Sequence, residues 1–374
     1  MLSRISGVTK NYDWGSKDLV PNFFGLEKPS KPIAEIWFGT HPLGESQSIG
    51  EQKSLSESLG KKLNFLVKFL SAERALSIQV HPNSQQAKDG FHFEQAQEIA
   101  LDDPKRNYKD SSHKPEALIA LTSFEALCGF RPKADLLLVF TEFGKSEPEF
   151  AVLAKSLTKG GSLEEIFQAL ISNTELAKRF TESVDSYQPD SIANKSRALV
   201  ERLLIQFPND TGALVALMLN EVSLEPGEAI YLPAGNIHAY LSGLGLEVMA
   251  ASDNVLRSGL TSKHIDVAQV LKLADFTELA EPKVRPRKLA ERLIEYPVDC
   301  PEFRVYRAEV SGKNLLADLD LPASAMVVCT AGEVAVSTSL EEREVLTKSQ
   351  VVFASAAKKL SLSGSGTAFV ILGD

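Results

Sequence analysis

The apolar residues of this 374-residue chain change their spacing along the sequence. From residue 1 to about 132, Gly and Pro break the chain into short apolar runs, which predict β-strands. Between about 132 and 208 the apolar residues recur with the 3.6-residue period of an amphipathic helix. Short runs return after residue 208 and continue to the end of the sequence. This pattern predicts a mostly β fold with one helical insertion.

The short apolar runs recur at intervals, with turn residues between them. Such spacing is typical of a β-sandwich, barrel or jelly roll. Helices are predicted outside the insertion at Ser84–Ala100 and near His264–Leu273. The predicted strands are Ile36–Phe38, Phe65–Leu70, Leu76–Val80, Ala117–Leu121, Ala213–Leu219, Ala229–Leu232, Leu246–Ala250, Ala325–Thr330, Val334–Ser337, Val351–Ala354 and Ala368–Leu372.

The helical stretch carries its own start and stop signals. Ser162 and Glu165 form an S-x-x-E capping box, and apolar residues follow on one helix face. A second apolar stripe ends at Pro208. Short apolar runs, which predict strands, return directly after Pro208, so this helical stretch interrupts a β domain.

We therefore expect two jelly-roll units and one helical insertion. Residues 1–132 and 209–265 would form the first, metal-binding unit, and residues 133–208 the insertion. Residues 266–374 would form the second jelly roll.

Charge and cysteine content restrict the partners and the location. With 49 acidic and 40 basic residues, the net charge of −9 has the wrong sign for a general binder of nucleic acid or anionic membranes. The three cysteines are scattered, and the sequence shows neither a signal peptide nor an apolar run of about 20 residues. We expect a cytoplasmic monomer that binds neither nucleic acid nor membranes.

The segment 227–238 has the form G-x5-P-x-G-x2-H. It predicts a strand, a tight turn in which Gly235 permits a positive φ, and a return strand that begins with His238. The turn would aim His238 into the mouth of a barrel. This segment resembles the second motif of the cupin superfamily, although Ser242 stands where an Asn often follows. A buried structural histidine is the alternative interpretation.

Two further segments offer metal ligands. Gln79 and His81 are two residues apart on a predicted strand, so their side chains share one face. Glu116 precedes an apolar strand and is well placed to point inward. With His238, these residues supply two imidazoles, one carboxylate and one amide. Such a set leaves a position for water or a substrate oxygen, as catalytic metal sites do.

Six motifs, in a fixed order, make a family resemblance specific. They are Asn11-Tyr-Asp-Trp-Gly15, Ala34-Glu-Ile-Trp-Phe-Gly39, QVHP, HKPE, PAGNIHAY and Asn254-Val-Leu-Arg-Ser-Gly-Leu-Thr-Ser-Lys263. From about residue 10 to 270, the chain resembles the type I phosphomannose isomerases. These zinc enzymes of the cupin superfamily interconvert mannose 6-phosphate and fructose 6-phosphate. Beyond residue 270 the chain resembles this family only in its pattern of short predicted strands.

The resemblance implies a phosphosugar substrate, a place in mannose and GDP-mannose metabolism, and one Zn²⁺ per subunit. The residues that match the family's zinc ligands are Gln79, His81, Glu116 and His238. Arg257 matches the catalytic arginine. The other catalytic candidates are Lys114, Glu247, Asp253 and His113. The candidates for substrate binding are Trp14, Glu35, Ser77, Tyr240 and Lys263.

Aldose–ketose isomerisation moves a proton between C1 and C2 through an enediolate. It needs a stabiliser of the developing oxyanion, a base, and cations for the phosphate. The base stays open among Glu247, Asp253, His113 and a zinc-bound water. The candidate cations for the phosphate are Lys114, Arg257, Lys263 and the segment Arg74–Ser77.

Two other functions fit part of the pattern. Two histidines and a carboxylate are also the ligands of non-haem Fe(II) oxygenases, but Gln79, Lys114 and Arg257 argue against that class. A non-catalytic sugar-binding cupin would tolerate the loss of Arg257, which this chain retains. The metal identity rests on the resemblance, because ligand spacing does not separate zinc from iron, manganese or cobalt.

Overall fold

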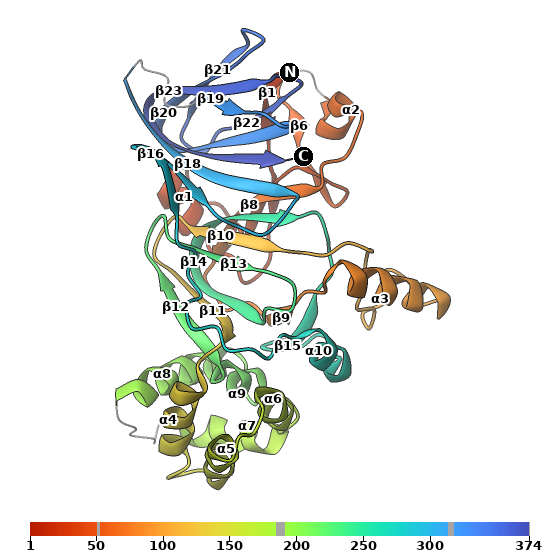
Figure 1. Cartoon of the computed structure of the whole chain (residues 1–374), viewed down its shortest axis with the longest axis vertical. Coiled ribbons are helices and arrows are strands. Elements are labelled where there is room, and N and C mark those ends of the chain that lie inside the picture. Colours follow the sequence, from red (N-terminus) through yellow and green to blue (C-terminus); the bar gives the residue numbers. More distant parts are fainter. Residues whose placement is uncertain (51–52, 185–190, 313–317, 374) are drawn as a thin grey trace.

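The computed structural model describes residues 1–50, 53–184, 191–312 and 318–373. Two large antiparallel sheets lie one above the other, and a unit of helices lies below them, so the molecule is elongated (Figure 1). This arrangement confirms the mostly β fold class. The parts of the predicted units that fall in the gaps lie outside the described residues.

The ten-stranded sheet carries the candidate ligands. Its main path is β12-β11-β14-β8-β3-β2, and β9, β10, β13 and β15 pair beside that path. Its long central strand β14 pairs with β8, β9, β10 and β11, so residues from four segments meet around it. The strands are β2 Val8–Lys10, β3 Glu35–Phe38, β8 Phe65–Ala72, β9 Ile78–Val80, β10 Glu116–Ala120, β11 Phe124–Phe130, β12 Leu219–Leu224, β13 Ala229–Leu232, β14 His238–Ala250 and β15 Leu256–Gly259.

The eleven-stranded sheet is built mainly from the carboxy-terminal part of the chain, but three short strands of the amino-terminal part join it. Strand β1 pairs with β22, where Leu2 lies opposite Ala354. In the predicted division, residues 1–132 belong to the first unit. In the structure, β1, β6 and β7 from that range pair within the second sheet. The strands are β1 Leu2–Ser6, β6 Gln47–Ser48, β7 Lys53–Ser54, β16 Arg287–Ala290, β17 Leu293–Tyr296, β18 Phe303–Gly312, β19 Asp318–Asp320, β20 Ser324–Thr338, β21 Arg343–Thr347, β22 Val351–Ser355 and β23 Lys359–Gly373. Strands β4 Thr40–His41 and β5 Gly44–Glu45 form a separate pair.

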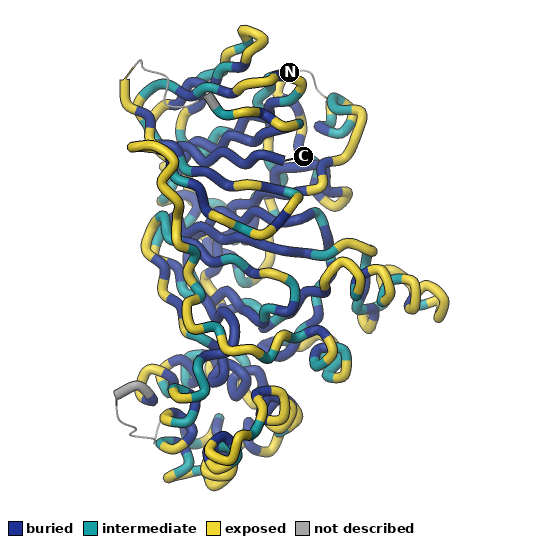
Figure 2. Tube along the Cα trace, in the orientation of Figure 1, coloured by how far each residue is buried: buried dark blue, intermediate teal, exposed yellow. Residues whose placement is uncertain are grey.

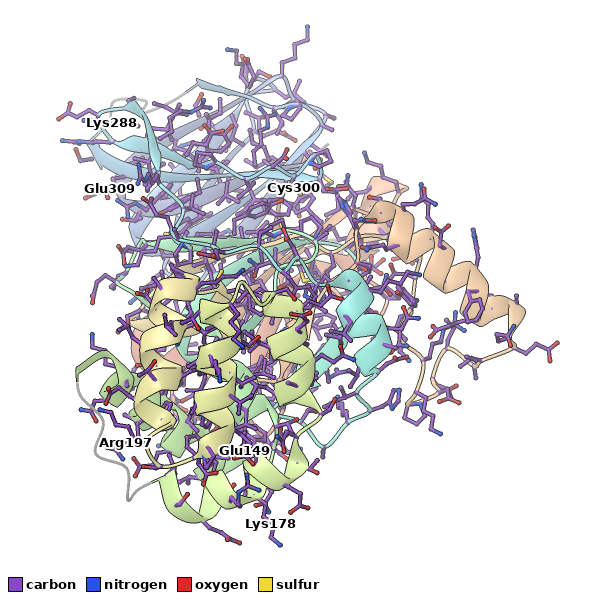
Figure 3. The ribbon with its side chains drawn as sticks, turned by 60° about the horizontal axis from the view of Figure 1, so that its bottom comes forward. Glu149, Lys178, Arg197, Lys288, Cys300 and Glu309 are labelled. Atoms are coloured by element: carbon purple, nitrogen blue, oxygen red, sulfur yellow. The ribbon has the colours of Figure 1, made fainter. Side chains whose placement is uncertain are left out.

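The helical insertion packs around its own phenylalanines, which are buried while the outer helix faces are exposed (Figure 2). Glu149, Lys178 and Arg197 lie on its helices, away from Lys288 and Glu309 on the strands (Figure 3). The insertion helices are α4 Lys133–Phe143, α5 Pro148–Thr158, α6 Leu163–Ile171, α7 Thr174–Ser183 and α8 Ser191–Gln206. The other helices are α1 Leu19–Phe24, α2 Leu55–Leu59, α3 Ser84–Ala96, α9 Gly212–Ala216 and α10 Val267–Leu273. None of the helices in the described ranges has the length and apolar character needed to cross a membrane.

The strand predicted at Ala213–Leu219 is wrong. The structure has helix α9 over Gly212–Ala216, and strand β12 begins only at Leu219. Every residue of α9 is buried, so the helix has no polar face and its apolar run shows no helical period. A short apolar run of this kind fits a buried strand and a buried helix equally well.

The capping box of α6 provides a test of how the insertion contributes to stability. Ser162 Oγ accepts the N–H of Glu165, and the Glu165 carboxylate accepts the N–H of Ser162. Ser162→Ala removes the first of these bonds, so we expect the free energy of unfolding to fall by about 1 kcal/mol. Denaturant unfolding measures it, and an unchanged midpoint would contradict the prediction.

Candidate active site

Three buried side chains that can bind a metal meet at the start or end of three strands. His81 follows β9 directly, Glu116 opens β10, and His238 opens β14. One ligand atom of each residue lies within 4.8 Å of the others. The sheet explains this meeting, because β10 and β9 both pair with β14 and Gln79 lies opposite His238.

The atoms of this cluster that face one another lack hydrogen bonds. His81 Nε2, His238 Nε2 and Glu116 Oε2 are buried without a hydrogen-bond partner. The two Nε2 atoms lie 3.5 and 3.4 Å from the Glu116 carboxylate oxygens. Buried polar groups without partners are costly, and a cation at their centre would satisfy all three.

The other nitrogen of each imidazole is held by the backbone. His81 Nδ1 lies 2.7 Å from the carbonyl oxygen of Asn254, and His238 Nδ1 lies 3.0 Å from that of Asn236. A carbonyl only accepts, so each Nδ1 carries the proton and donates it. Each Nε2 then presents a lone pair to the centre of the cluster, as metal-binding histidines do.

The charges around the cluster keep its carboxylate ionised. Burial raises the pKa of Glu116, but Lys114, whose Nζ lies 3.2 Å from Glu116 Oε1, and His81 hold it well below its usual range. Burial also lowers the pKa of His81 to about 4. An ionised carboxylate and neutral imidazoles are the forms that bind a divalent cation. The residues present therefore fit such an ion.

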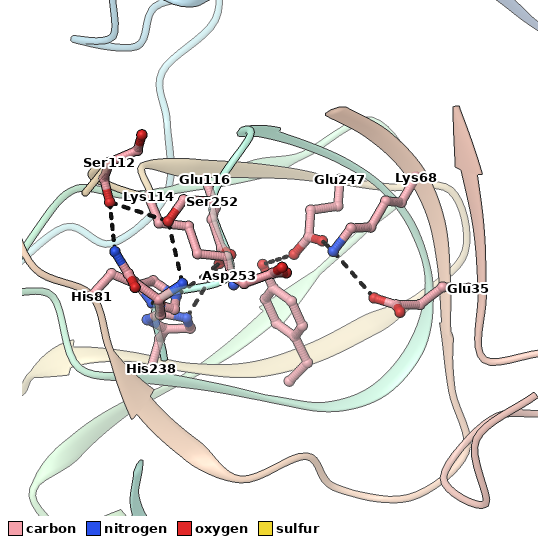
Figure 4. Close-up of polar contacts among 12 residues, drawn as sticks. Glu35, Lys68, His81, Ser112, Lys114, Glu116, His238, Glu247, Ser252 and Asp253 are labelled. Carbon is pink, nitrogen blue, oxygen red and sulfur yellow. Dashed lines mark hydrogen bonds and ion pairs between the residues drawn. The ribbon is translucent and has the colours of Figure 1, made fainter. Parts of the chain in front are cut away.

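A second group of buried polar side chains lies beside this cluster (Figure 4). Lys68 Nζ lies 2.9 Å from Glu247 and 3.3 Å from Glu35. Tyr240 donates its hydroxyl hydrogen to Glu247 at 2.9 Å, and Trp37 donates its ring N–H to Glu35 at 3.0 Å. Although burial lowers the pKa of Lys68, the two carboxylates raise it above its usual value.

Our sequence analysis missed Lys68. Its signal was present, because it is the one charged residue within the apolar run FLVKFL of β8. A lysine in a strand whose every residue is buried needs a carboxylate partner. Its carboxylate partners are Glu35 on β3 and Glu247 on β14, and only the fold shows that these strands bring them to Lys68.

Asp253 lies between these two groups (Figure 4). Its Oδ2 is 3.2 Å from His41 Nε2, and its side chain is 41% exposed. Burial raises the pKa of Asp253, but the hydrogen bond and charge of His41, with Lys114 and Lys68, bring it below its usual value. The carboxylate is therefore ionised and its side chain is only partly buried.

His113 lies near the cluster in sequence but has its partner in the carboxy-terminal part. Its Nε2 is 2.6 Å from Glu302 Oε1, and Cys300 Sγ donates to the other Glu302 oxygen at 3.0 Å. The structure thus ties His113 to Glu302, whereas Lys114 faces Glu116.

Arg257 and Lys263 are two cations on either side of the turn that follows β15. Arg257 lies opposite Gln79 in the pairing of β15 with β9. The charge of Arg257 is the first cause that lowers the pKa of Lys263, with burial second. Among the described residues neither side chain has an ion-pair partner. Two cations without a carboxylate suit an anion.

Of the other predicted substrate-binding residues, Ser77 lies just before β9 and is half-buried. Trp14 is half-buried and packs beside the apolar cluster that contains Tyr240. Neither side chain reaches the metal-binding cluster through a described contact.

Comparisons with known proteins agree with this arrangement. A model of the phosphomannose isomerase type I catalytic domain matches residues 2–133. Mannose-6-phosphate isomerase of Escherichia coli is 31% identical over 98% of both chains. The human mannose-6-phosphate isomerase is 32% identical over 96% of this chain and 94% of its own.

Solved structures show the same likeness over the whole chain. A Salmonella typhimurium mannose 6-phosphate isomerase bound to fructose 6-phosphate and zinc has a TM-score of 0.88 and 30% identity, covering 100% of this chain and 99% of the other. Fold and site together define a metal-dependent enzyme of the cupin class. Within that class, the chain belongs to the mannose-6-phosphate isomerase family.

Proposed function

We propose that this chain interconverts mannose 6-phosphate and fructose 6-phosphate, with one Zn²⁺ held by His81, Glu116, His238 and the nearby Gln79. The observation that carries the proposal is the set of three unpartnered ligand atoms buried at one point. The relatives at about 31% identity, and the Salmonella structure with fructose 6-phosphate and zinc, support it. When bound, zinc supplies positive charge that orients and polarises the sugar oxygens.

The residues beside the metal-binding cluster have different roles in the isomerisation. Arg257 and Lys263 bind the phosphate, which fixes the sugar by its far end. Lys114 is buried beside the ligands and donates to the oxygen on which negative charge develops in the enediolate.

Asp253 is our choice among the protein groups for the base that moves the proton between C1 and C2. Its carboxylate is ionised and its side chain is 41% exposed. Glu247 is buried and bound by Lys68 and Tyr240. His113 is held by Glu302. Glu35 and Tyr240 act through Lys68 and Glu247, whose positions they hold.

We also propose that the protein is a cytoplasmic monomer that feeds mannose and GDP-mannose metabolism. All three cysteines are buried and unpaired, which supports a reducing compartment. Gel filtration with light scattering tests the monomer, since a mass of twice 40.8 kDa would contradict it.

A coupled isomerase assay before and after chelation tests the function. We expect activity with zinc, loss of activity after chelation, and recovery on adding zinc back. Activity that survives complete metal removal would contradict the zinc mechanism. Oxygen consumption with Fe(II), in the absence of isomerisation, would favour the oxygenase instead.

Asn254 is expected to control metal affinity without binding the metal. Its carbonyl oxygen accepts the His81 Nδ1–H, and its side chain bonds the backbone of Lys109, Asp110 and Ser112. Asn254→Ala frees this segment, so we expect zinc to bind about 10- to 100-fold more weakly. Competition with a chelator of known affinity measures the change, and unchanged affinity would contradict the prediction.

A further inference from the structure

The turn that ends the helical insertion reaches back to the loop after β15. Asp210 lies in this turn, between α8 and α9. Its Oδ1 accepts the backbone N–H of Gly212 at 2.7 Å and that of Leu260 at 2.9 Å. Its Oδ2 accepts the N–H of Thr261 at 2.9 Å. One carboxylate thus joins the end of the insertion to the loop that leads to Lys263.

This loop has a backbone that needs support. Leu260 has a φ of 53°, in the left-handed region that residues with side chains rarely adopt, and it is 1% exposed. Gly259 has a φ of 142°, and a Cβ there would lie 2.2 Å from the Cα of Gly212. The chain therefore turns sharply against α9, and the bonds to Asp210 offset the cost of that turn.

The supported turn sets the position of Lys263. The backbone N–H of Lys263 donates to Thr261 Oγ1 at 3.1 Å, directly after the turn. Arg257 on β15 and Lys263 lie on the two sides of this turn. Since like charges repel, a turn that is held by Asp210 helps to keep both cations at this end of the site when no anion is bound.

The carboxy-terminal end of α8 also contacts the segment that precedes β9. Gln206, the last residue of α8, accepts the backbone N–H of Ala75 at 3.0 Å through its side-chain oxygen. Ala75 lies in the segment Arg74–Ser77, another candidate for the phosphate. Gln206 and Asp210 therefore bond to two segments that carry candidate cations for the phosphate, Arg74–Ser77 and the loop after β15.

We propose that Asp210 is a positioning residue, which holds Lys263 beside Arg257 for the phosphate group of the substrate. The inference rests on the proposed function, which assigns the phosphate to these two cations. Asp210 acts through Lys263 and touches no substrate atom. The turn that follows the helical insertion thereby sets the affinity for the phosphorylated end of the sugar.

A double-mutant cycle on the zinc-loaded protein tests this role. Asp210→Asn keeps Oδ1 but turns an NH₂ group toward the Thr261 N–H, so the loop loses one bond. We expect KM for fructose 6-phosphate to rise about tenfold, with kcat within about twofold, a size typical of coupled neighbours. Calorimetric binding of fructose 6-phosphate should weaken by the same factor. The double variant with Lys263→Ala should bind no more weakly than Lys263→Ala alone.

Two further variants guard against a purely structural effect. Ser162→Ala destabilises the insertion without touching the turn, so it should lower Tm and leave KM unchanged. Thr261→Ala removes the Oγ1 that accepts the Lys263 N–H and should raise KM by a second route. Additive losses in the double variant, or an equal rise in KM for Ser162→Ala, would overturn the proposal.

The cycle also separates this proposal from the proposed function. Wild-type protein that binds fructose 6-phosphate without isomerising it would refute the isomerase, while the binding cycle would still decide the role of Asp210. Wild-type protein that does not bind fructose 6-phosphate at all would overturn both.

Discussion

Replacing Glu116 by glutamine is expected to weaken zinc binding at least about 100-fold and to lower kcat about 10³-fold, equivalent to about 4 kcal/mol. Glu116 supplies the only negative charge among the four candidate ligands. The amide would leave the charge of the cation uncompensated. It would also leave Lys114, now 3.2 Å from a carboxylate oxygen, without its ion-pair partner. Bound zinc per protein and the coupled isomerase assay measure the two effects.

Glu94→Gln is a matched control for that change. Glu94 is also buried, and its carboxylate accepts the backbone N–H groups of Asn107 and Tyr108 near Arg106. It lies in α3, outside the barrel that holds the cluster. We expect Glu94→Gln to cost stability and to keep zinc. Full zinc occupancy and wild-type kcat in the Glu116→Gln protein would remove Glu116 from the ligand set.

Replacing Lys68 by methionine is expected to lower the free energy of unfolding by about 3–5 kcal/mol. Methionine fills much of the same volume, so the loss comes from charge. Glu35 and Glu247 would stay buried without the cation that now lies 3.3 and 2.9 Å away. Denaturant unfolding measures the change. Lys10→Met is the control, because Lys10 also lies over the Trp37 ring but is not enclosed between carboxylates.

The pH dependence of this loss has a definite sign. Burial already raises the pKa of Glu247, and removing Lys68 would raise it further. A carboxyl whose folded pKa is raised stabilises the fold at low pH, and this stability is lost as the pH rises through the folded pKa. The deficit of Lys68→Met should therefore grow as the pH rises above the usual range of a carboxyl pKa. A deficit independent of pH would mean that packing, and not charge, causes it.

Much of the candidate site could be predicted from the sequence because its residues lie in short motifs whose Gly, Pro and apolar residues indicate the local backbone structure. Gly235, with a φ of 81°, ends the turn that leads to His238, and the pattern of Gly and Pro revealed that turn. His81, Glu116 and His238 each begin or follow a strand with a clear apolar run. The structure brings these three together.

The remaining features depend on contacts between distant segments. Lys68 needs partners from two other strands, and Asp210 serves a loop about 50 residues further along the chain, at Leu260 and Thr261. Lys68 stands out as the one charged residue of an apolar run, but the sequence does not show its partners, and no neighbour of Asp210 in sequence signals its role. Helix α9 was mistaken for a strand because burial on all sides removes the polar face that reveals a helix.

The pairing of β1 with β22 has a consequence for synthesis. Leu2 emerges from the ribosome long before its neighbour Ala354 is made. Strand β1 therefore stays without this partner while the residues between them are synthesised. Contacts of such long range slow folding and leave strand edges open to wrong partners. We infer that β1 joins the second sheet late, only once β22 has been made.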